Sequence, residues 1–228
     1  MSIAENLDII RKRIAEASRS SGRKPEDISL IAVTKTRTAA EADEAVSAGI
    51  NNIGENRVQE AKLKFPILAS SPVKHMIGHL QSNKAKEAVK LFDMIQSVDS
   101  LRLLAEIDRE ARKNNKVLNV LAEVNIGGEA TKSGMKPEEL SGFLSESVKY
   151  LNVRVSGLMT IAPFLESQEK VRPYFKKMKE LFEEAARFSA PNVKMEHLSM
   201  GMSGDFVTAI EEGATMVRIG TAIFGERK

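Results

Sequence analysis

Residues Val117-Leu118-Asn119-Val120-Leu121-Ala122-Glu123-Val124 form a run that is apolar at both odd and even positions. A β-strand points successive side chains to opposite faces, so this run predicts a strand that is covered on both faces. Such strands are typical of parallel sheets covered by helices, whereas antiparallel sheets commonly alternate apolar and polar residues. The segment therefore predicts an α/β protein.

The alternation of strand and helix extends in both directions from this segment. Apolar runs predict eight strands, over residues 28–34, 50–54, 74–78, 94–98, 117–124, 153–159, 195–200 and 215–219. Apolar residues at helical spacing predict a first helix over 3–20 and further helices near 38–48, 56–63, 83–91, 100–114, 137–149, 167–188 and 204–212. Thr38 and Glu41 have the spacing of a capping box, and Gly49 follows that helix.

Eight strands joined by helical connections predict a closed (β/α)8 TIM barrel. The helix over 3–20 is expected to cover the gap between the eighth strand and the first, because no helix is predicted after the last strand. A doubly wound open sheet is the alternative, since the same alternation occurs there. No Pro/Gly/Ser-rich linker, low-complexity segment or internal repeat occurs, so we expect one domain over residues 1–228.

Composition narrows the class of protein. The 34 basic residues are interspersed with 31 acidic ones, and only 9 Phe and 2 Tyr are present, so we expect no nucleic-acid partner. The absence of cysteine excludes disulfides, thiolate metal sites and cysteine nucleophiles. The charged N-terminus and the lack of an apolar stretch of membrane-spanning length predict a cytoplasmic protein with no membrane partner.

Polar or reactive side chains follow nearly every predicted strand. Because barrel enzymes and ligand-binding barrels use the carboxyl ends of their strands, these residues are the candidates for a site. They are Lys35, Glu55, Asn56, His79, Ser82, Ser97, Asn125, Thr160, Ser199, Arg218 and Thr221. His75 and His197 fall inside strands and are expected to pack, and no group of residues has metal-ligand spacing.

Lys35 follows the first predicted strand. A lysine there is commonly a solvated surface amine. A partly desolvated amine with a lowered pKa would instead condense with an aldehyde. The sequence at this position allows both roles.

Two turns at the other end of the chain are candidates for a phosphate site. Ser199-Met200-Gly201-Met202-Ser203-Gly204-Asp205 and Gly220-Thr221 follow the last two strands, the recurrent phosphate-binding pair in this fold. Arg218 lies in the last strand, where it is either a fixed cation at the barrel mouth or the partner of Glu196 or Glu123 in a salt bridge. An amine together with a phosphate site points to pyridoxal phosphate (PLP).

These segments also carry a resemblance that extends over nearly the whole chain. The motifs are 32–36, 54–56, 75–84, 124–126, 132–134, 157–160, 198–203 and 217–221. They resemble the pyridoxal phosphate homeostasis protein family, also described as proline synthase co-transcribed homologues. The resemblance implies a barrel like the N-terminal domain of alanine racemase.

The resemblance also implies a set of cofactor-binding residues. PLP would be held as an internal aldimine on Lys35, and Arg218 would face its pyridine nitrogen. Phosphate contacts map to Ser199, Ser203, Gly220 and Thr221, and the pocket lining maps to Asn56 and Ser82. No residue is assigned to catalysis and none to a metal.

Three functions are compatible with this site. The resemblance implies a non-catalytic protein that stores, buffers or delivers PLP in vitamin B6 homeostasis, with apo PLP-dependent enzymes as partners. We expect a monomer, because the second domain through which racemases form their dimer contact is not expected in this sequence. A PLP-dependent amino-acid racemase is the alternative, but it needs a base on each face of the substrate. Tyr150 and Tyr174 are not expected at the barrel mouth, which leaves His79 as the second base. An aldolase acting on a phosphorylated sugar would use the same amine, but the protein would be colourless.

Overall fold

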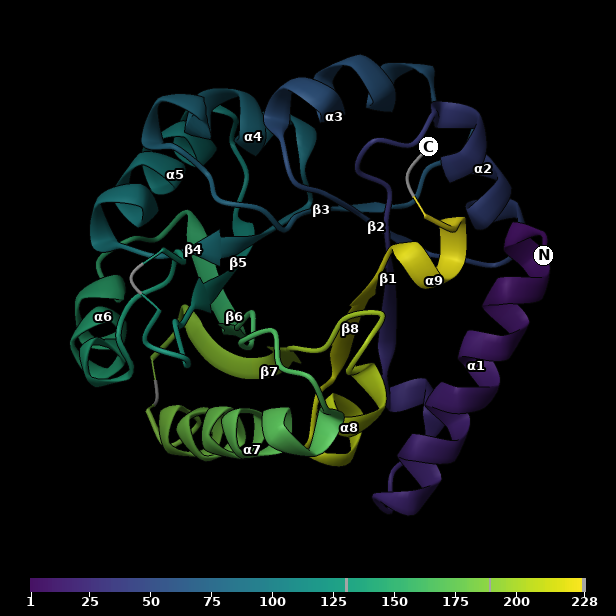
Figure 1. Cartoon of the computed structure of the whole chain (residues 1–228). Helices are drawn as coiled ribbons and strands as arrows, with labels where there is room; N and C mark the ends of the chain where they lie inside the picture. Colours follow the sequence, from purple (N-terminus) through teal and green to yellow (C-terminus); the bar gives the residue numbers. More distant parts are fainter. Residues whose placement is uncertain (130, 189, 227–228) are drawn as a thin grey trace.

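The computed structural model describes residues 1–129, 131–188 and 190–226. Eight parallel strands close into a barrel in chain order, with β8 paired to β1 (Figure 1). The predicted closed barrel is confirmed, and the open doubly wound sheet is wrong. The predicted domain over 1–228 includes residues 130, 189, 227 and 228, which lie outside the described part.

All eight predicted strands are present, with shifts of one or two residues at their ends. They are Ser29–Val33 (β1), Asn52–Glu55 (β2), Val73–Met76 (β3), Met94–Val98 (β4), Leu118–Glu123 (β5), Val153–Met159 (β6), Val193–Ser199 (β7) and Met216–Ile219 (β8). Their carboxyl ends share one mouth of the barrel, because every pairing in the sheet is parallel.

The helices form a ring around the barrel (Figure 1). They are Ile3–Ser20 (α1), Ala39–Ser47 (α2), Val58–Lys64 (α3), Ala85–Leu91 (α4), Leu101–Lys113 (α5), Leu140–Ser147 (α6), Gln168–Ala185 (α7), Phe206–Glu211 (α8) and Thr221–Phe224 (α9). The sequence missed α9 because four residues are too few to show helical periodicity. The predicted capping box is confirmed: the Thr38 side chain accepts from the N–H of Glu41, and the Glu41 side chain accepts from the N–H of Thr38.

Helix α1 covers the seam of the barrel, as predicted. It contacts α8, α9 and α2, and so lies outside β8 and β1 (Figure 1). Its buried face carries the apolar residues Leu7, Ile10, Ile14 and Ala17 at helical spacing, followed by Ser18. The helix α9 that follows the last strand has only four residues, and α1, which precedes the first strand, covers the rest of the seam.

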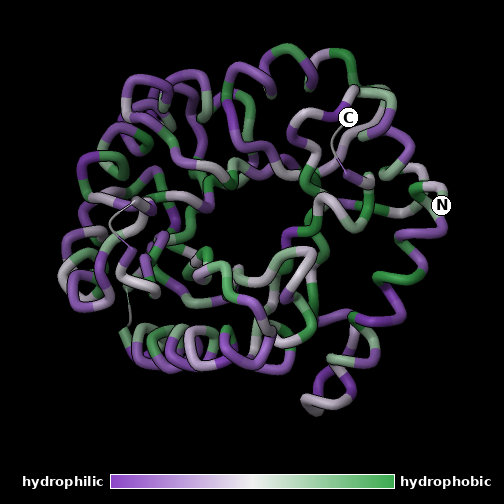
Figure 2. The backbone as a smooth tube through the Cα atoms, in the orientation of Figure 1, coloured by the Kyte–Doolittle hydropathy of each residue, from purple (hydrophilic) through white to green (hydrophobic). Residues whose placement is uncertain are grey.

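The core has two layers. A large apolar cluster fills the space between the strands and the helices, and a small one lies inside the barrel (Ile31, Met94, Leu121, Met159 and Met216). In Figure 2 the surrounding helices alternate between hydrophilic and hydrophobic stretches, as helices with one buried face do. No helix in the described ranges is long and apolar enough to cross a membrane.

Candidate functional site

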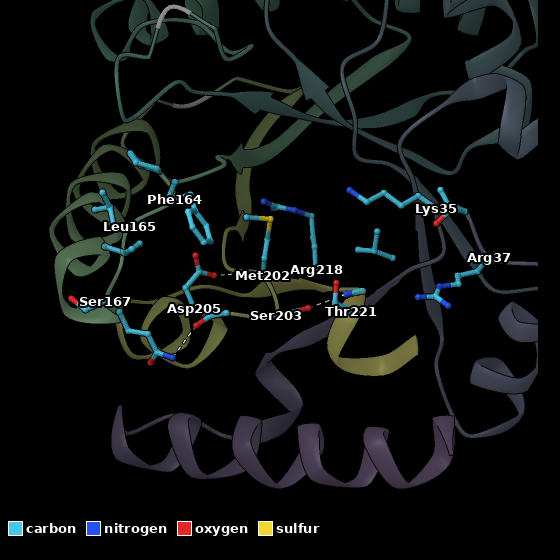
Figure 3. A pocket seen from close by; sticks show the side chains of 18 residues that line it. Lys35, Arg37, Phe164, Leu165, Ser167, Met202, Ser203, Asp205, Arg218 and Thr221 are labelled. Atoms are coloured by element: carbon cyan, nitrogen blue, oxygen red, sulfur yellow. Dashed lines mark hydrogen bonds between the residues drawn. The ribbon is translucent and has the colours of Figure 1, made fainter. Parts of the chain in front are cut away.

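A cavity of about 280 Å³ lies at the carboxyl end of the barrel, beside the ends of β1 and β8. Figure 3 shows the side chains that line it, with Lys35 on one side, Phe164 and Asp205 on the other, and Arg218 between them. These residues come from segments far apart in the chain. The parallel barrel brings them together because all its strands end at one mouth.

Lys35 lies two residues beyond the end of β1, in a turn, and is half-buried. The sequence predicted Lys35 directly after a strand over 28–34, and because β1 ends at Val33, the structure places it one residue further from the end of the strand. Its side chain extends into the cavity toward Arg218 (Figure 3). The amine of the first strand therefore shares a cavity with the loops that follow the last two strands.

Those two loops are joined by a hydrogen-bonding hydroxyl. Ser203 Oγ, in the loop after β7, accepts from the backbone N–H groups of Gly220 and Ala222, each at 3.3 Å. Two donors that follow β8, one from Gly220 and one from the first turn of α9, therefore converge on one oxygen atom at the cavity, where Ser203, Gly220 and Thr221 all contribute to the lining. Such converging N–H groups suit an anion.

Arg218 is a buried cation, with 4% of its surface exposed. It donates to Ser199 Oγ at 2.5 Å and to the carbonyl of Thr160 at 2.7 Å, and both acceptors are neutral. Burial lowers the pKa of Arg218 to about 10, against the opposing effect of Glu123 and Asp205. The guanidinium remains charged at neutral pH, and its position at the cavity favours a ligand that offers it an acceptor.

Glu196 was one of the two partners predicted for a salt bridge with Arg218. This prediction is wrong, because the Glu196 carboxylate pairs with the Lys194 amine at 2.6 Å. The other, Glu123, acts on Arg218 through charge.

Ser199 is fully buried and lies beneath Arg218. Its hydroxyl donates to Gln96 Oε1 at 2.7 Å, Gln96 Nε2 donates to His75 Nδ1 at 3.0 Å, and His75 Nε2 donates to Asn52 Oδ1 at 3.0 Å. Burial lowers the pKa of His75 to about 4, so the ring is neutral and packed, as predicted. Ser199 is thus placed to hold Arg218, and its predicted contact with phosphate stays a prediction.

The residues after β2 and β3 lie apart from the Lys35 cavity. Asn56 and His79 line a second cavity of about 450 Å³. Ser82 begins the short turn Ser82–Lys84 next to it. His79 is largely exposed and lies 3.3 Å from Asp99. The roles of Asn56 and Ser82 in lining a cofactor pocket stay predictions.

Sequence reasoning did not select several residues that line the cavity. Phe164, in the loop after β6, is 99% exposed at the cavity rim, and Met202 and Asp205 follow β7. Asp205 Oδ1 accepts from the N–H of Met202 at 2.6 Å, and burial raises the pKa of Asp205. Asp205 is the last residue of the segment 199–205, which was selected as a phosphate site for its small residues. An acidic side chain is not expected to contact a phosphate, so the sequence did not indicate a role for Asp205.

Glu123, at the end of β5, is a second carboxyl group that the sequence did not assign to the site. It is 4% exposed, and its Oε2 atom has no hydrogen-bond partner in the described part of the chain. Burial raises its pKa to about 7, with a further contribution from Asp99 and an opposing one from Arg218.

We expect Glu123→Gln to change how stability depends on pH. The unfolded chain loses this proton near pH 4.5 and the folded protein near pH 7, so ionisation of Glu123 lowers the free energy of unfolding as pH rises between these values. The variant cannot ionise, so it should be more stable than the unmodified protein at pH 8 by roughly 1–3 kcal/mol, with a much smaller difference at pH 4. Urea denaturation at several pH values measures this, and a difference that does not depend on pH would contradict it.

The site has the parts for one kind of ligand. A primary amine, a buried guanidinium and converging backbone donors share one cavity, which suits a small molecule with a carbonyl carbon and an anionic group. No group of three or more His, Cys, Asp or Glu side chains within 1–129, 131–188 and 190–226 could hold a metal ion.

Comparison with known proteins gives concordant results. The family model described as alanine racemase, N-terminal domain, matches residues 5–228. A relative from Aquifex aeolicus (strain VF5), named pyridoxal phosphate homeostasis protein, is 46% identical over 229 residues and covers 100% of both chains. The structure of PipY from Synechococcus elongatus PCC7942 with PLP bound is 35% identical, with a TM-score of 0.85, and the match covers 98% of this chain and 100% of that one.

Alanine racemase itself is a more distant neighbour. The enzyme of Clostridium difficile 630 is 20% identical with a TM-score of 0.73, and the match covers 98% of this chain but 57% of the racemase. At this identity the comparison shows a shared fold alone.

Proposed function

The chain belongs to the pyridoxal phosphate homeostasis protein family, whose barrel is that of the alanine racemase N-terminal domain, and from this premise we propose that it binds PLP in the Lys35 cavity and serves in vitamin B6 homeostasis. The observation that carries the proposal is the meeting of Lys35, Arg218 and the two loops at one cavity. In this role the protein would store, buffer or deliver the cofactor.

Lys35 is the residue that would hold PLP covalently. PLP supplies an aldehyde, which joins a primary amine through a carbon–nitrogen double bond with loss of water. Lys35 is half-buried, and its side chain extends into the cavity (Figure 3).

The loops after β7 and β8 would hold the phosphate. The N–H groups of Gly220 and Ala222 already converge on the hydroxyl oxygen of Ser203, and the space beside Gly204 is open enough for a ligand to approach the backbone. Thr221 adds a hydroxyl to the same rim. We propose Ser203, Gly220 and Thr221 as the phosphate contacts.

Arg218 would face the pyridine nitrogen. A guanidinium keeps its proton at neutral pH and donates hydrogen bonds, so it favours an unprotonated ring nitrogen and weakens the ring as an electron sink. This effect supports a non-catalytic role. The relatives are named as homeostasis proteins, which agrees with such a role.

A racemase would also need a second base opposite Lys35. Tyr174 lies within α7 and Tyr150 beyond the end of α6, both packed against the core between strands and helices. Their position supports binding without racemisation.

The proposal predicts that the protein takes up PLP and becomes coloured. On addition of PLP we expect a new visible absorption band, which borohydride reduction removes while fixing the cofactor to the peptide that contains Lys35, as located by mass spectrometry. A protein that takes up no PLP, or that carries it on another residue, would overturn the proposal. Incubation with L-alanine followed by chiral chromatography tests catalysis, because rapid turnover would show an enzyme.

We further propose that the protein acts in the cytoplasm as a monomer and passes its cofactor to apo enzymes. Mixing the PLP-loaded protein with an apo PLP-dependent enzyme should restore that enzyme's activity faster than release of PLP into solution allows. Equal rates would contradict direct transfer.

A further inference from the structure

A buried group of charged side chains lies directly beneath Lys35. Lys64, near the end of α3, is 6% exposed. Its amine donates to Glu55 Oε1 at 2.5 Å, to the carbonyl of Thr34 at 2.6 Å and to Glu60 Oε1 at 3.3 Å. Lysine is almost never buried to this degree unless it is paired, so this arrangement calls for a physical reason.

Two contacts of Lys64 and Glu60 hold the backbone on either side of Lys35. Lys64 binds the carbonyl of Thr34, the residue before it, and Glu60 Oε1 accepts from the N–H of Thr36, the residue after it. Thr36 has φ of +63°, a left-handed conformation that a β-branched residue rarely adopts. The turn that carries Lys35 therefore has an unfavourable backbone conformation that the Lys64 and Glu60 contacts hold in place.

Stability alone gives a weak reason for this arrangement. Glu55 is fully buried, and burial raises its pKa against the opposing hydrogen bonds from Lys64 and Thr34. Removing two charges from water is costly, and well-packed apolar residues commonly replace a buried ion pair without loss of stability. The contacts with Thr34 and Thr36 do, however, restrict the backbone from which the Lys35 side chain extends.

We propose that Lys64 and Glu60 are positioning residues, which hold the backbone around Lys35 so that its amine is aimed at the carbonyl carbon of a bound aldehyde. The inference rests on the proposed function and extends it to residues that do not line the Lys35 cavity. It predicts that the two contacts matter for forming the covalent bond and not for holding the phosphate.

Two ligands separate these contributions. PLP can bind covalently, whereas pyridoxine 5′-phosphate has the same ring and phosphate but no aldehyde. The test variants are Glu60→Ala and Lys64→Met. The Glu60 side chain is 26% exposed, and its removal leaves the Lys64–Glu55 pair intact. The matched control is Lys62→Met on the same helix, because the Lys62 side chain is 63% exposed and pairs only with Glu87 in the described structure.

We expect both test variants to form the PLP adduct about tenfold more slowly, since small displacements of a reacting group have large effects on rate. Stopped-flow absorbance gives the rate, and borohydride trapping gives the yield. The dissociation constant for pyridoxine 5′-phosphate should stay within about twofold, and Lys62→Met should match the unmodified protein for both ligands. Should Lys64→Met fail to fold because Glu55 is left unpaired, Glu60→Ala carries the test.

Two results would overturn the inference alone. These are adduct formation at the unmodified rate in Glu60→Ala, and an equal loss of affinity for both ligands, which would indicate a general collapse of the cavity. If the unmodified protein itself forms no adduct with PLP, the proposed function fails and this inference fails with it.

Discussion

Lys35→Ala is expected to lose the covalent adduct with PLP completely, together with the visible absorption band and the borohydride-fixed cofactor. The reason is chemical, because alanine has no amine to form a bond with the aldehyde. The loop contacts formed by Ser203 and Gly220 do not involve Lys35, so the variant should still bind PLP through its phosphate. We expect affinity to fall on the order of 100-fold, the contribution of the covalent link to retention. Absorbance spectroscopy and equilibrium dialysis measure both effects.

Lys35→Arg provides the matched control. It keeps the positive charge at the cavity, but a guanidinium stays protonated at neutral pH and does not condense with an aldehyde as a free amine does. It should therefore lose the adduct as completely as Lys35→Ala. A variant of either kind that still carries cofactor fixed by borohydride would show that another lysine forms the bond.

Gly157→Ala is expected to cause the largest loss of stability. Gly157 lies in β6, where the register of β6 against β7 shifts, and its φ is +152°. A Cβ atom there would lie 1.9 Å from the backbone oxygen and 2.7 Å from the carbonyl carbon of His197 on β7. The obstacle is backbone within a closed barrel, which cannot move away without breaking strand pairing. We expect a loss on the order of 4 kcal/mol or more in the free energy of unfolding, measured by urea denaturation.

Gly142→Ala is the control for that substitution. Gly142 lies in α6, and apart from its chain neighbours and the nearby backbone of its own helix, no atom lies within 4 Å of the position that its Cβ would take. Alanine favours the helix over glycine, so this variant should gain about 0.5–1 kcal/mol. Equal effects at the two positions would contradict the steric argument.

Local sequence accounts for most of the barrel. Apolar runs place all eight strands, since a strand buried on both faces needs apolar residues at successive positions, as 117–124 shows. The capping box at Thr38 and Glu41 marks the start of α2, because its hydrogen bonds lie within four residues of each other. The helix that the sequence did not predict, α9, has only four residues.

The candidate site was predicted in part. Lys35, Ser203, Arg218, Gly220 and Thr221 line one cavity, because strand order in a closed parallel barrel places the end of the first strand beside the end of the last. That much followed from counting strands. Ser199 does not line that cavity, because whether a strand-end side chain faces the mouth or the interior depends on barrel geometry. Its hydroxyl lies beneath Arg218 and binds Gln96, a residue distant in sequence.

The sequence by itself determined where the strands and helices lie and that Lys35 would meet two small-residue turns, because apolar periodicity, capping and strand order are local or countable properties. Only the tertiary structure decided that Lys64 is buried under Lys35 and that Glu123 holds its proton to about pH 7. A lysine near the end of a helix is ordinarily solvated, and a carboxyl group ordinarily ionises near pH 4.5. Burial and the charges of residues distant in the chain change the solvation of Lys64 and the pKa of Glu123. The sequence next to these residues shows neither the burial nor the distant charges.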